Sequence, residues 1–365
     1  MNKIVYIVKT KLHYYPPCVS QIRMIKRLGY DIDVLYGSSN ESALNLLKIE
    51  NINCIKICDM HDENIGKLKK MLEWINYRKE LWKIMKKYPS DTIYWFGTGE
   101  SIIPMKGKLN GKCYVLSLLE LLDHEKLKRN LIKKLAQNAN AVTVCEETRG
   151  YLMQSWWNLK KLPYVFPNKP FDQITNKNAD GKVKESQNII KRIKEKNVIL
   201  YQGMIQNTEE LVEFAKALKS ANKDYILLLM GLDRYNSVSK IKQIYDKKIF
   251  VDYIPAPHHL EVTSYAKIGI VFYRPDSLNK AFCAPNKIYE YSGFGIPIIG
   301  NSIPGLKNTV GKYGAAECIN LTQNNIIEAI NKIENNYEIY SQNAKNFFES
   351  TDNLETTKQL LEDLK

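Results

Sequence analysis

Residues 4–35 read IVYIVKTKLHYYPPCVSQIRMIKRLGYDIDVL, and this stretch indicates the fold class of the chain. Ile4–Val8 is a short, fully apolar strand, and Asp31–Leu35 is a second strand. Between them, Val19–Leu28 has apolar residues at helical spacing and ends at Gly29. A strand, a helix and a further strand in this order predict a βαβ unit with parallel strands.

The same rhythm continues along the chain and then restarts. Further strands are expected at 52–57, 92–96, 112–117 and 141–145, and the second series opens with Asn197–Tyr201. Alternating elements of this kind predict an α/β protein with two doubly wound, Rossmann-like parallel sheets. We expect an N-terminal domain over 1–175, a second domain over 186–340, and a helical tail over 341–365 that crosses back to the first domain. The two domains are expected to face each other across a cleft.

Composition favours an ordinary globular protein. The chain has 365 residues, 44% hydrophobic and 25% charged, and its longest apolar stretches fall far short of the ~20 residues of a membrane-spanning helix. The N-terminus shows no secretory signal, so we expect a cytoplasmic protein. The seven cysteines are scattered without a C-x-x-C pair, which favours reduced thiols over a zinc site. The absence of a G-x-G-x-x-G or Walker motif argues against nicotinamide and P-loop enzymes. No cofactor and no metal are expected.

Charge is distributed unevenly along the chain. The net charge is +14, and residues 1–172 hold 28 basic and 17 acidic residues, so the first half carries +11 of it. This asymmetry suggests an anionic partner, either a phospholipid surface, a pyrophosphate-bearing substrate or a nucleic acid. The alternative is that the excess of basic residues serves only to keep the protein soluble. No aromatic stacking motif supports nucleic-acid binding.

Residues 284–300 read APNKIYEYSGFGIPIIG and carry the most specific pattern in the sequence. This segment resembles the donor-binding motif of glycosyltransferases with the GT-B fold, in particular the large retaining family, glycosyltransferase family 4-like, that builds bacterial polysaccharides. Weaker similarities to that family lie, in the family's order, at 139–147, 162–170 and 200–203. The resemblance implies that Glu290 accepts hydrogen bonds from the ribose diol of a sugar nucleotide and that Lys287 neutralises its diphosphate. The alternative is an exposed i, i+3 ion pair on an ordinary helix.

Other residues complete or weaken the resemblance. Asn286 lies near the start of the expected helix, where it can hold a phosphate, and Gly203 ends the strand that opens the second domain. The sequence has Phe282 where the family often has a Glu that contacts the donor sugar, and Gln206–Glu210 where it often has a basic residue. Phosphate neutralisation then falls to Lys287 and Arg274, although Arg274 is equally well explained as a surface charge.

Two residues of the first domain are candidates for catalysis or acceptor binding. His13 lies in the loop after the first strand and is placed to orient an acceptor hydroxyl, unless it is simply a solvated loop histidine. Glu120 follows the fifth strand, in a segment that resembles the acidic stretch over the donor or acceptor in related transferases. It is the best candidate for a catalytic carboxylate in this domain.

The helix expected over 65–88 combines apolar and basic residues. Leu68, Met71, Leu72 and Ile75 have helical spacing, and lysines lie between them and after them. Such a helix either packs on the sheet or lies on an anionic membrane surface, and both hold if only its polar face meets lipid headgroups.

Together these features predict a metal-independent glycosyltransferase of hexosyl or N-acetylhexosaminyl type, and the resemblance implies that it retains the anomeric configuration. It would transfer a sugar from a nucleoside-diphosphate donor to a hydroxyl of a glycan or lipid-pyrophosphate-linked acceptor in bacterial surface polysaccharide biosynthesis, with peripheral contact at the inner face of the cell membrane. The alternatives are a sugar-nucleotide epimerase of the same fold and a non-catalytic basic binding module. No nucleic-acid partner is expected.

Overall fold

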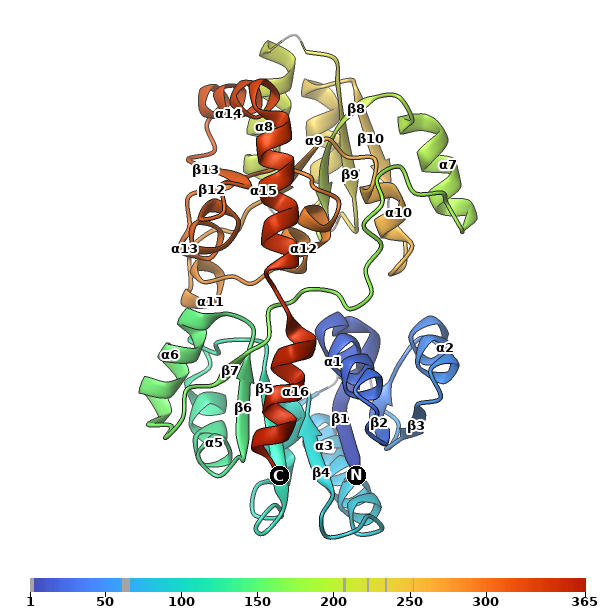
Figure 1. The fold of residues 1–365 in the computed structure, drawn as a ribbon, viewed down its shortest axis with the longest axis vertical. Helices are drawn as coiled ribbons and strands as arrows, with labels where there is room; N and C mark the ends of the chain where they lie inside the picture. Colours follow the sequence, from blue (N-terminus) through green and yellow to red (C-terminus); the bar gives the residue numbers. More distant parts are fainter. Residues whose placement is uncertain (1–2, 61–65, 206–207, 222, 234, 252) are drawn as a thin grey trace. The chain divides into compact units, whose positions relative to one another are not determined.

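The computed structural model describes residues 3–60, 66–205, 208–221, 223–233, 235–251 and 253–365. The chain forms two compact units (Figure 1). Unit 1 comprises Met1–Phe171, Ser277–Asn279 and Asp352–Lys365, and unit 2 comprises Asp172–Asp276 and Lys280–Thr351.

Unit 1 is built on a seven-stranded sheet of order β3-β2-β1-β4-β5-β6-β7, in which all pairs are parallel. Helices cover both faces, so its central strands are mostly buried and apolar. The strands are β1 (Ile4–Lys11), β2 (Ile32–Ser38), β3 (Asn53–Lys56), β4 (Ile93–Phe96), β5 (Cys113–Leu118), β6 (Ala141–Val144) and β7 (Tyr164–Val165). The helices are η1 (Leu12–Tyr14), α1 (Pro16–Arg27), α2 (Glu41–Ile49), α3 (Lys67–Met85), α4 (Gly99–Ile102), η2 (Ile103–Met105), α5 (Lys126–Gln137), α6 (Glu147–Trp157) and α16 (Asn353–Asp363).

Unit 2 repeats this plan with a six-stranded parallel sheet of order β10-β9-β8-β11-β12-β13. Its strands are β8 (Asn197–Gln202), β9 (Tyr225–Met230), β10 (Lys248–Val251), β11 (Ile268–Val271), β12 (Ile298–Asn301) and β13 (Ala316–Ile319). Its helices are α7 (Lys184–Ile193), α8 (Thr208–Ser220), α9 (Ser237–Ile244), α10 (His259–Thr263), α12 (Asn286–Gly293), α13 (Pro304–Leu306), η3 (Lys307–Gly311), α14 (Gln323–Asn335) and α15 (Tyr337–Glu349). The short helix α11 (Leu278–Ala281) runs from the segment assigned to unit 1 into unit 2.

The two parallel sheets confirm the predicted fold class, with informative differences at strand ends. β1 continues past the expected end at Val8 to Lys11, because Lys9 is buried beside an acidic partner and does not end the strand. The edge strand β13 was not expected. Most of its residues are only partly buried, and Glu317 interrupts its apolar pattern.

Each sheet changes strand order at its centre. In unit 1 the reversal lies between β1 and β4, and in unit 2 it lies between β8 and β11. In open α/β sheets, ligands bind beyond the carboxyl ends of the strands at such a reversal. Ligand sites are therefore expected among the residues that follow β1 and β4 in unit 1 and among those that follow β8 and β11 in unit 2.

The end of the chain belongs to unit 1. Helix α16 packs against α1, and its residues Thr357, Leu360 and Leu361 are fully buried. The leucines join a core cluster with Ile4 of the first strand, so the unit is completed by residues more than 350 positions from its start.

Helix α3 corresponds to the helix expected over 65–88, whose first residue, Ile65, lies outside the described residues. Its C-terminal half packs on unit 1, where Tyr77, Leu81 and Met85 are fully buried. Its first turns instead expose their apolar side chains, so the packing of the apolar stripe on the sheet holds only for the C-terminal half of the helix. Within the described part of the chain, no helix combines the length and apolar character needed to cross a membrane.

Candidate donor site in unit 2

The buried carboxylate of Glu290 is the centre of the candidate site. Glu290 lies on α12, which begins at Asn286 directly after the extended N-cap residue Pro285. Glu290 is only 8% exposed, so the alternative that Lys287 and Glu290 form an exposed ion pair on the helix surface is wrong. The side-chain amide of Gln202, the last residue of β8, donates a hydrogen bond to Oε2, and Nε2 of His259 on α10 lies 3.5 Å from Oε1.

The partners of Glu290 are themselves fixed. The Thr263 hydroxyl donates to Oε1 of Gln202 at 2.7 Å, which sets the orientation of the amide that faces Glu290. The Tyr291 hydroxyl accepts from the backbone N–H of Gln202 at 3.2 Å and donates to the Leu200 carbonyl, also at 3.2 Å. These bonds hold the carboxylate at the carboxyl end of β8. Each oxygen of a carboxylate can accept two hydrogen bonds, and each oxygen of Glu290 has one close partner here, so Glu290 can accept further bonds.

Lys287, one turn before Glu290, lies on the ring of Tyr201. Its Nζ is 4.6 Å from the centre of that ring and 5.8 Å from the ring of Tyr273. Burial lowers the pKa of Lys287 to about 8, although the nearby Glu290 acts in the opposite direction. The charged form of Lys287 therefore costs free energy, and an anion that replaced its lost hydration would be bound favourably.

Gly203 makes room for this lysine. Its φ is +105°, and a Cβ at this position would lie 2.8 Å from Cε and 3.1 Å from Nζ of Lys287. Glycine is required here both by the backbone conformation and by the close approach of the side chain. The structure thus brings Gly203, Lys287 and Glu290 together, with Asn286 as the first residue of the same helix.

Arg274 is engaged elsewhere. Its Nε donates to Oε1 of Glu210 at 2.8 Å, and one terminal nitrogen donates to Oε2 of Glu209 at 2.8 Å. These two carboxylates raise the pKa of the guanidinium and satisfy its charge. Of the segment Gln206–Glu210, the first two residues lie outside the described residues. Arg274 would have to leave its partners to meet a diphosphate.

In unit 1, Glu120 is exposed and contacts the segment Ser277–Asn279. The side-chain amide of Asn279 donates to Oε2 of Glu120, and its Oδ1 accepts from the backbone N–H of Leu121 at 3.0 Å. Glu120 also lines a pocket of about 130 Å³ at the carboxyl ends of β4 and β5. Polar side chains of Tyr15, Thr98, Glu100, Glu125 and Lys128 also line this pocket, beside leucine and isoleucine.

His13 is held by a different contact. Its Nδ1 accepts from the backbone N–H of Asn40 at 3.1 Å, and its ring meets Tyr14 edge-on. Burial and, secondarily, Lys11 lower the pKa of His13. A neutral ring whose Nδ1 accepts a bond presents a proton at Nε2, so His13 is suited to donate rather than to accept. Of the described residues, Tyr15 lines the pocket beside Glu120 and His13 does not.

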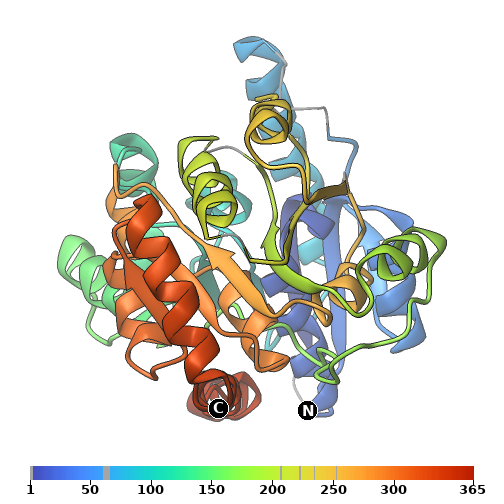
Figure 2. The same cartoon turned by 90° about the horizontal axis from the view of Figure 1, so that it is seen from above.

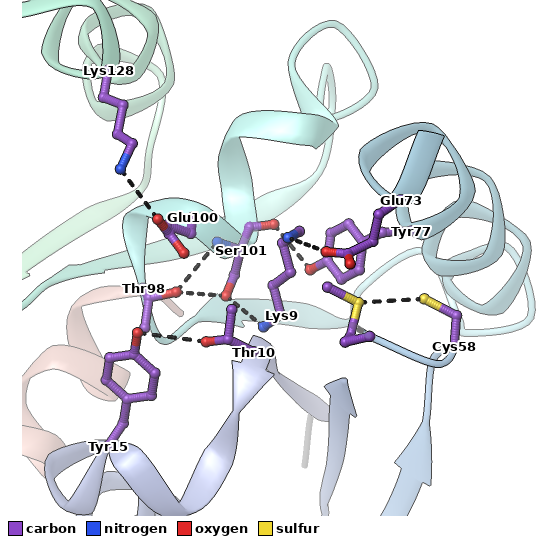
Figure 3. A network of polar contacts seen from close by, with 11 residues as sticks. Lys9, Thr10, Tyr15, Cys58, Glu73, Tyr77, Thr98, Glu100, Ser101 and Lys128 are labelled. Carbon is purple, nitrogen blue, oxygen red and sulfur yellow. Dashed lines mark hydrogen bonds and ion pairs between the residues drawn. The ribbon is translucent and has the colours of Figure 1, made fainter. Parts of the chain in front are cut away.

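A polar network at the ends of β1 and β4 was not expected from the sequence (Figure 3). Nζ of Lys9 lies 3.2 Å from Oε1 of Glu73, and these side chains are only 5% and 8% exposed. The backbone N–H of Lys9 donates to the Ser101 hydroxyl at 2.9 Å, and the Tyr77 hydroxyl donates to the Ser101 carbonyl at 3.0 Å. The only signal in the sequence is a lysine that directly follows an apolar strand.

The residues His259 and Thr263 were also missed. They lie on α10, some 30 positions before Glu290 and 60 after Gln202, and no spacing in the sequence links them to either residue. Gln202 lies within 200–203, one of the stretches that resemble the family.

Comparison with known proteins places the fold. No family model matches the sequence, and no curated protein matches it significantly. Among solved structures, Alr3699/HepE of Anabaena in complex with UDP and glucose is 12% identical, with a TM-score of 0.71 over 99% of both chains. Sucrose-phosphate synthase of Thermosynechococcus elongatus is 14% identical, with a TM-score of 0.67 over 99% of this chain and 98% of the other.

A third similar structure comes from Listeria monocytogenes and is assigned as a UDP-N-acetylglucosamine 2-epimerase. It is 12% identical, with a TM-score of 0.60 over 99% of this chain and 94% of the other. These similarities and the two parallel sheets confirm the GT-B fold predicted from the sequence.

Proposed function

We propose that this GT-B protein is a glycosyltransferase that transfers a sugar from a nucleoside-diphosphate donor to an acceptor hydroxyl. The observation that carries the proposal is the buried Glu290 carboxylate, one helical turn from the lysine that stacks on Tyr201, at the carboxyl end of β8. The similarity to a protein solved with UDP and glucose supports a uridine nucleotide as the donor.

Donor binding follows from the chemistry of these groups. The free acceptor capacity of Glu290 suits the two hydroxyls of a ribose, and hydrogen bonds to a carboxylate are among the stronger ones. Lys287 meets the diphosphate, whose charge replaces the hydration that the ammonium lost on burial. The N-terminus of α12 at Asn286 adds the partial positive charge of a helix start.

The transfer itself breaks the bond between the anomeric carbon and the diphosphate oxygen, and that oxygen takes the electron pair. The acceptor oxygen forms the new bond to the anomeric carbon and loses its proton. Positive groups placed where the diphosphate charge develops lower the barrier to this step. We propose that Lys287 and the start of α12 supply that charge without a metal, and that the anomeric configuration is retained.

For the acceptor, we propose the pocket of unit 1 that Glu120 lines. Its mixture of carboxylates, hydroxyls and aliphatic side chains suits a sugar, which presents hydroxyls at its edges and apolar faces above and below. Glu120 orients the attacking hydroxyl or takes its proton, and His13 donates to a neighbouring part of the acceptor. The sugar transferred is a hexose or N-acetylhexosamine, and the acceptor is a glycan or a lipid-pyrophosphate-linked glycan of a bacterial surface polysaccharide. We further propose that the reaction takes place in the cytoplasm at the inner face of the membrane.

A sugar-nucleotide epimerase is the second candidate. Two observations favour it: His259 lies beside the Glu290 carboxylate, and one similar structure is assigned as an epimerase. The two activities differ in their need for an acceptor. Incubation with a UDP-sugar alone, followed by proton NMR of the sugar, would show an inverted carbon for an epimerase and an unchanged sugar for a transferase.

The donor site is tested by thermal unfolding of the purified protein with UDP, GDP, ADP, CMP and their sugar conjugates. A ligand that binds only the native state raises the melting temperature, by an amount that corresponds to about 2.7 kcal/mol at a hundredfold excess over the dissociation constant. We expect one nucleoside diphosphate to respond, and Glu290→Gln to reduce its shift. Glu213→Gln on the surface of α8 is the matched control and should respond as the wild type does. A full response from Glu290→Gln, or no response to any nucleotide at millimolar concentration, would refute the site.

A further inference from the structure

The first two turns of α3 carry a stripe of exposed apolar side chains. Leu68, Met71, Leu72 and Ile75 are between 55% and 75% exposed. Their spacing of three and four residues places them on one side of the helix. These turns extend beyond the sheet of unit 1, where the light-blue helix is drawn in Figure 2. Four large apolar side chains in one exposed row need an explanation that single exposed residues do not.

Basic residues continue the same side of the helix toward its C-terminal end. At about 100° per residue, Lys79, Lys83 and the C-cap residue Lys86 fall within the same arc of about 120° as the apolar stripe. All three lysines are exposed. We call this surface the α3 face and define it as Leu68, Met71, Leu72, Ile75, Lys79, Lys83 and Lys86.

The acidic residues of α3 lie off this face. Glu73 is buried beside Lys9, and Glu80 lies to one side of the face, 3.9 Å from Nζ of Lys83. Trp82 lies at the basic end, with Nζ of Lys86 5.7 Å and Nζ of Lys108 5.4 Å from its ring. A tryptophan among lysines beside an apolar stripe is typical of a surface at the boundary between lipid and water.

We propose that the α3 face lies in the interface of an anionic membrane, with its four apolar side chains in the outer part of the acyl layer and its lysines against lipid phosphates. The net charge of +11 over residues 1–172 complements such a surface, which favours lipid over a neutral protein partner. This inference deepens the proposed function and rests on it, because it brings the enzyme to the surface that holds a lipid-linked acceptor. The inference also means that the four apolar side chains, and not the lysines alone, hold the protein on the membrane.

Sedimentation with vesicles tests the proposal. We expect the full chain to bind vesicles of phosphatidylglycerol and phosphatidylcholine and to bind pure phosphatidylcholine at least tenfold more weakly, because each lysine near an anionic surface contributes about 1 kcal/mol. The double variant Leu68→Gln and Leu72→Gln should lower binding to the anionic vesicles by about tenfold or more, since it removes apolar side chains from the acyl layer. Glutamine keeps a high helix propensity, so the helix itself should be retained.

A matched control replaces an equally exposed apolar residue of unit 2. Ile339 on α15 is 61% exposed and Leu72 is 62% exposed, so Ile339→Gln removes similar surface from another part of the molecule. This variant should bind vesicles as the wild type does. Circular dichroism and the melting temperature establish that each variant is folded.

Three outcomes would overturn the proposal. Vesicle binding that is reversed by salt and unchanged in the leucine double variant would show contact through lysines alone. The absence of binding to anionic vesicles would exclude a membrane as the partner of the α3 face. A concentration-dependent dimer that the double variant abolishes would make a second copy of the chain the occupant of the stripe. The nucleotide-dependent rise in melting temperature of the same variants reports the donor site separately, so failure of one proposal is distinguishable from failure of the other.

Discussion

If Lys287 meets a diphosphate as proposed, its lowered pKa makes nucleotide binding dependent on pH in a calculable way. Its pKa of about 8 means that about 90% of the lysine is protonated at pH 7 and about 3% at pH 9.5. A bound diphosphate holds the proton on the lysine, so binding above pH 8 must include proton uptake. Affinity for UDP should therefore fall about 30-fold between pH 7 and pH 9.5, or about 2 kcal/mol at about 1.4 kcal/mol per factor of ten.

Isothermal titration calorimetry measures this directly. UDP is titrated at several pH values, in buffers of different ionisation enthalpy, so that the proton uptake is read from the heats. Uridine, which lacks the diphosphate, is the reference for any pH dependence that does not come from Lys287. The variant Lys287→Met should bind UDP more weakly at pH 7 and should lose the pH dependence, whereas Lys216→Met on the surface of α8 should keep it.

The substitution Lys287→Met, which should weaken UDP binding, should increase the stability of the protein without nucleotide. A lysine whose folded pKa lies below its ordinary value destabilises the fold while it is protonated, and this cost is relieved as pH rises from about 8 toward 10.5. Lys287→Met should therefore stabilise the empty protein at pH 7, on the order of 1–3 kcal/mol. A UDP affinity that stays constant from pH 7 to 9.5 in the wild type would refute the contact between Lys287 and the diphosphate.

Three further tests address the geometry of the candidate donor site and the buried pair of Lys9 and Glu73. Gly203→Ala places a Cβ against the lysine of the donor site at a positive φ, so we expect a loss of about 1–2 kcal/mol in urea unfolding together with weaker UDP binding; unchanged binding would contradict the geometry. Thr263→Val removes the donor to Oε1 of Gln202 and should cost about 1–3 kcal/mol of stability, because a buried oxygen is left without its bond. Lys9→Met removes the cation that lies 3.2 Å from the buried Glu73 carboxylate and should cost about 3–5 kcal/mol, whereas Lys9→Met with Glu73→Leu should recover most of that loss. Equal losses in the single and double variants would show that the pair is not coupled.

The fold was largely predictable from the sequence because buried parallel strands are short apolar runs between helical patterns. Residues 4–8 and 225–230 are recognisable as strands without any knowledge of their neighbours. Edge strands are less recognisable, and β13 was missed because only Ala316 among its residues is buried. Lys9 was read as the end of an apolar run, since a sequence does not show that Glu73 compensates its charge.

The candidate site was predictable only where its residues are close in the sequence. Lys287 and Glu290 lie one turn apart on a single helix, and a known motif links them. The groups that fix Glu290 come from β8 and α10, and contacts between such distant segments exist only in the folded chain. The partners of Arg274 could not be predicted either. Glu209 and Glu210 stand in a segment where the family often has a basic residue, but nothing in the sequence pairs these two carboxylates with Arg274.

The burial of α16 in unit 1 has a consequence for synthesis on the ribosome. Leu360 and Leu361 close a core that also holds Ile4 and Val8, yet residue 353 is translated about 180 residues after Phe171. At roughly 5–20 residues per second, the nascent unit 1 waits about 10 to 40 s with part of its apolar surface uncovered. During that interval the growing chain is a substrate for chaperones that bind exposed apolar surface, and premature termination before α16 leaves a product that cannot complete its first unit.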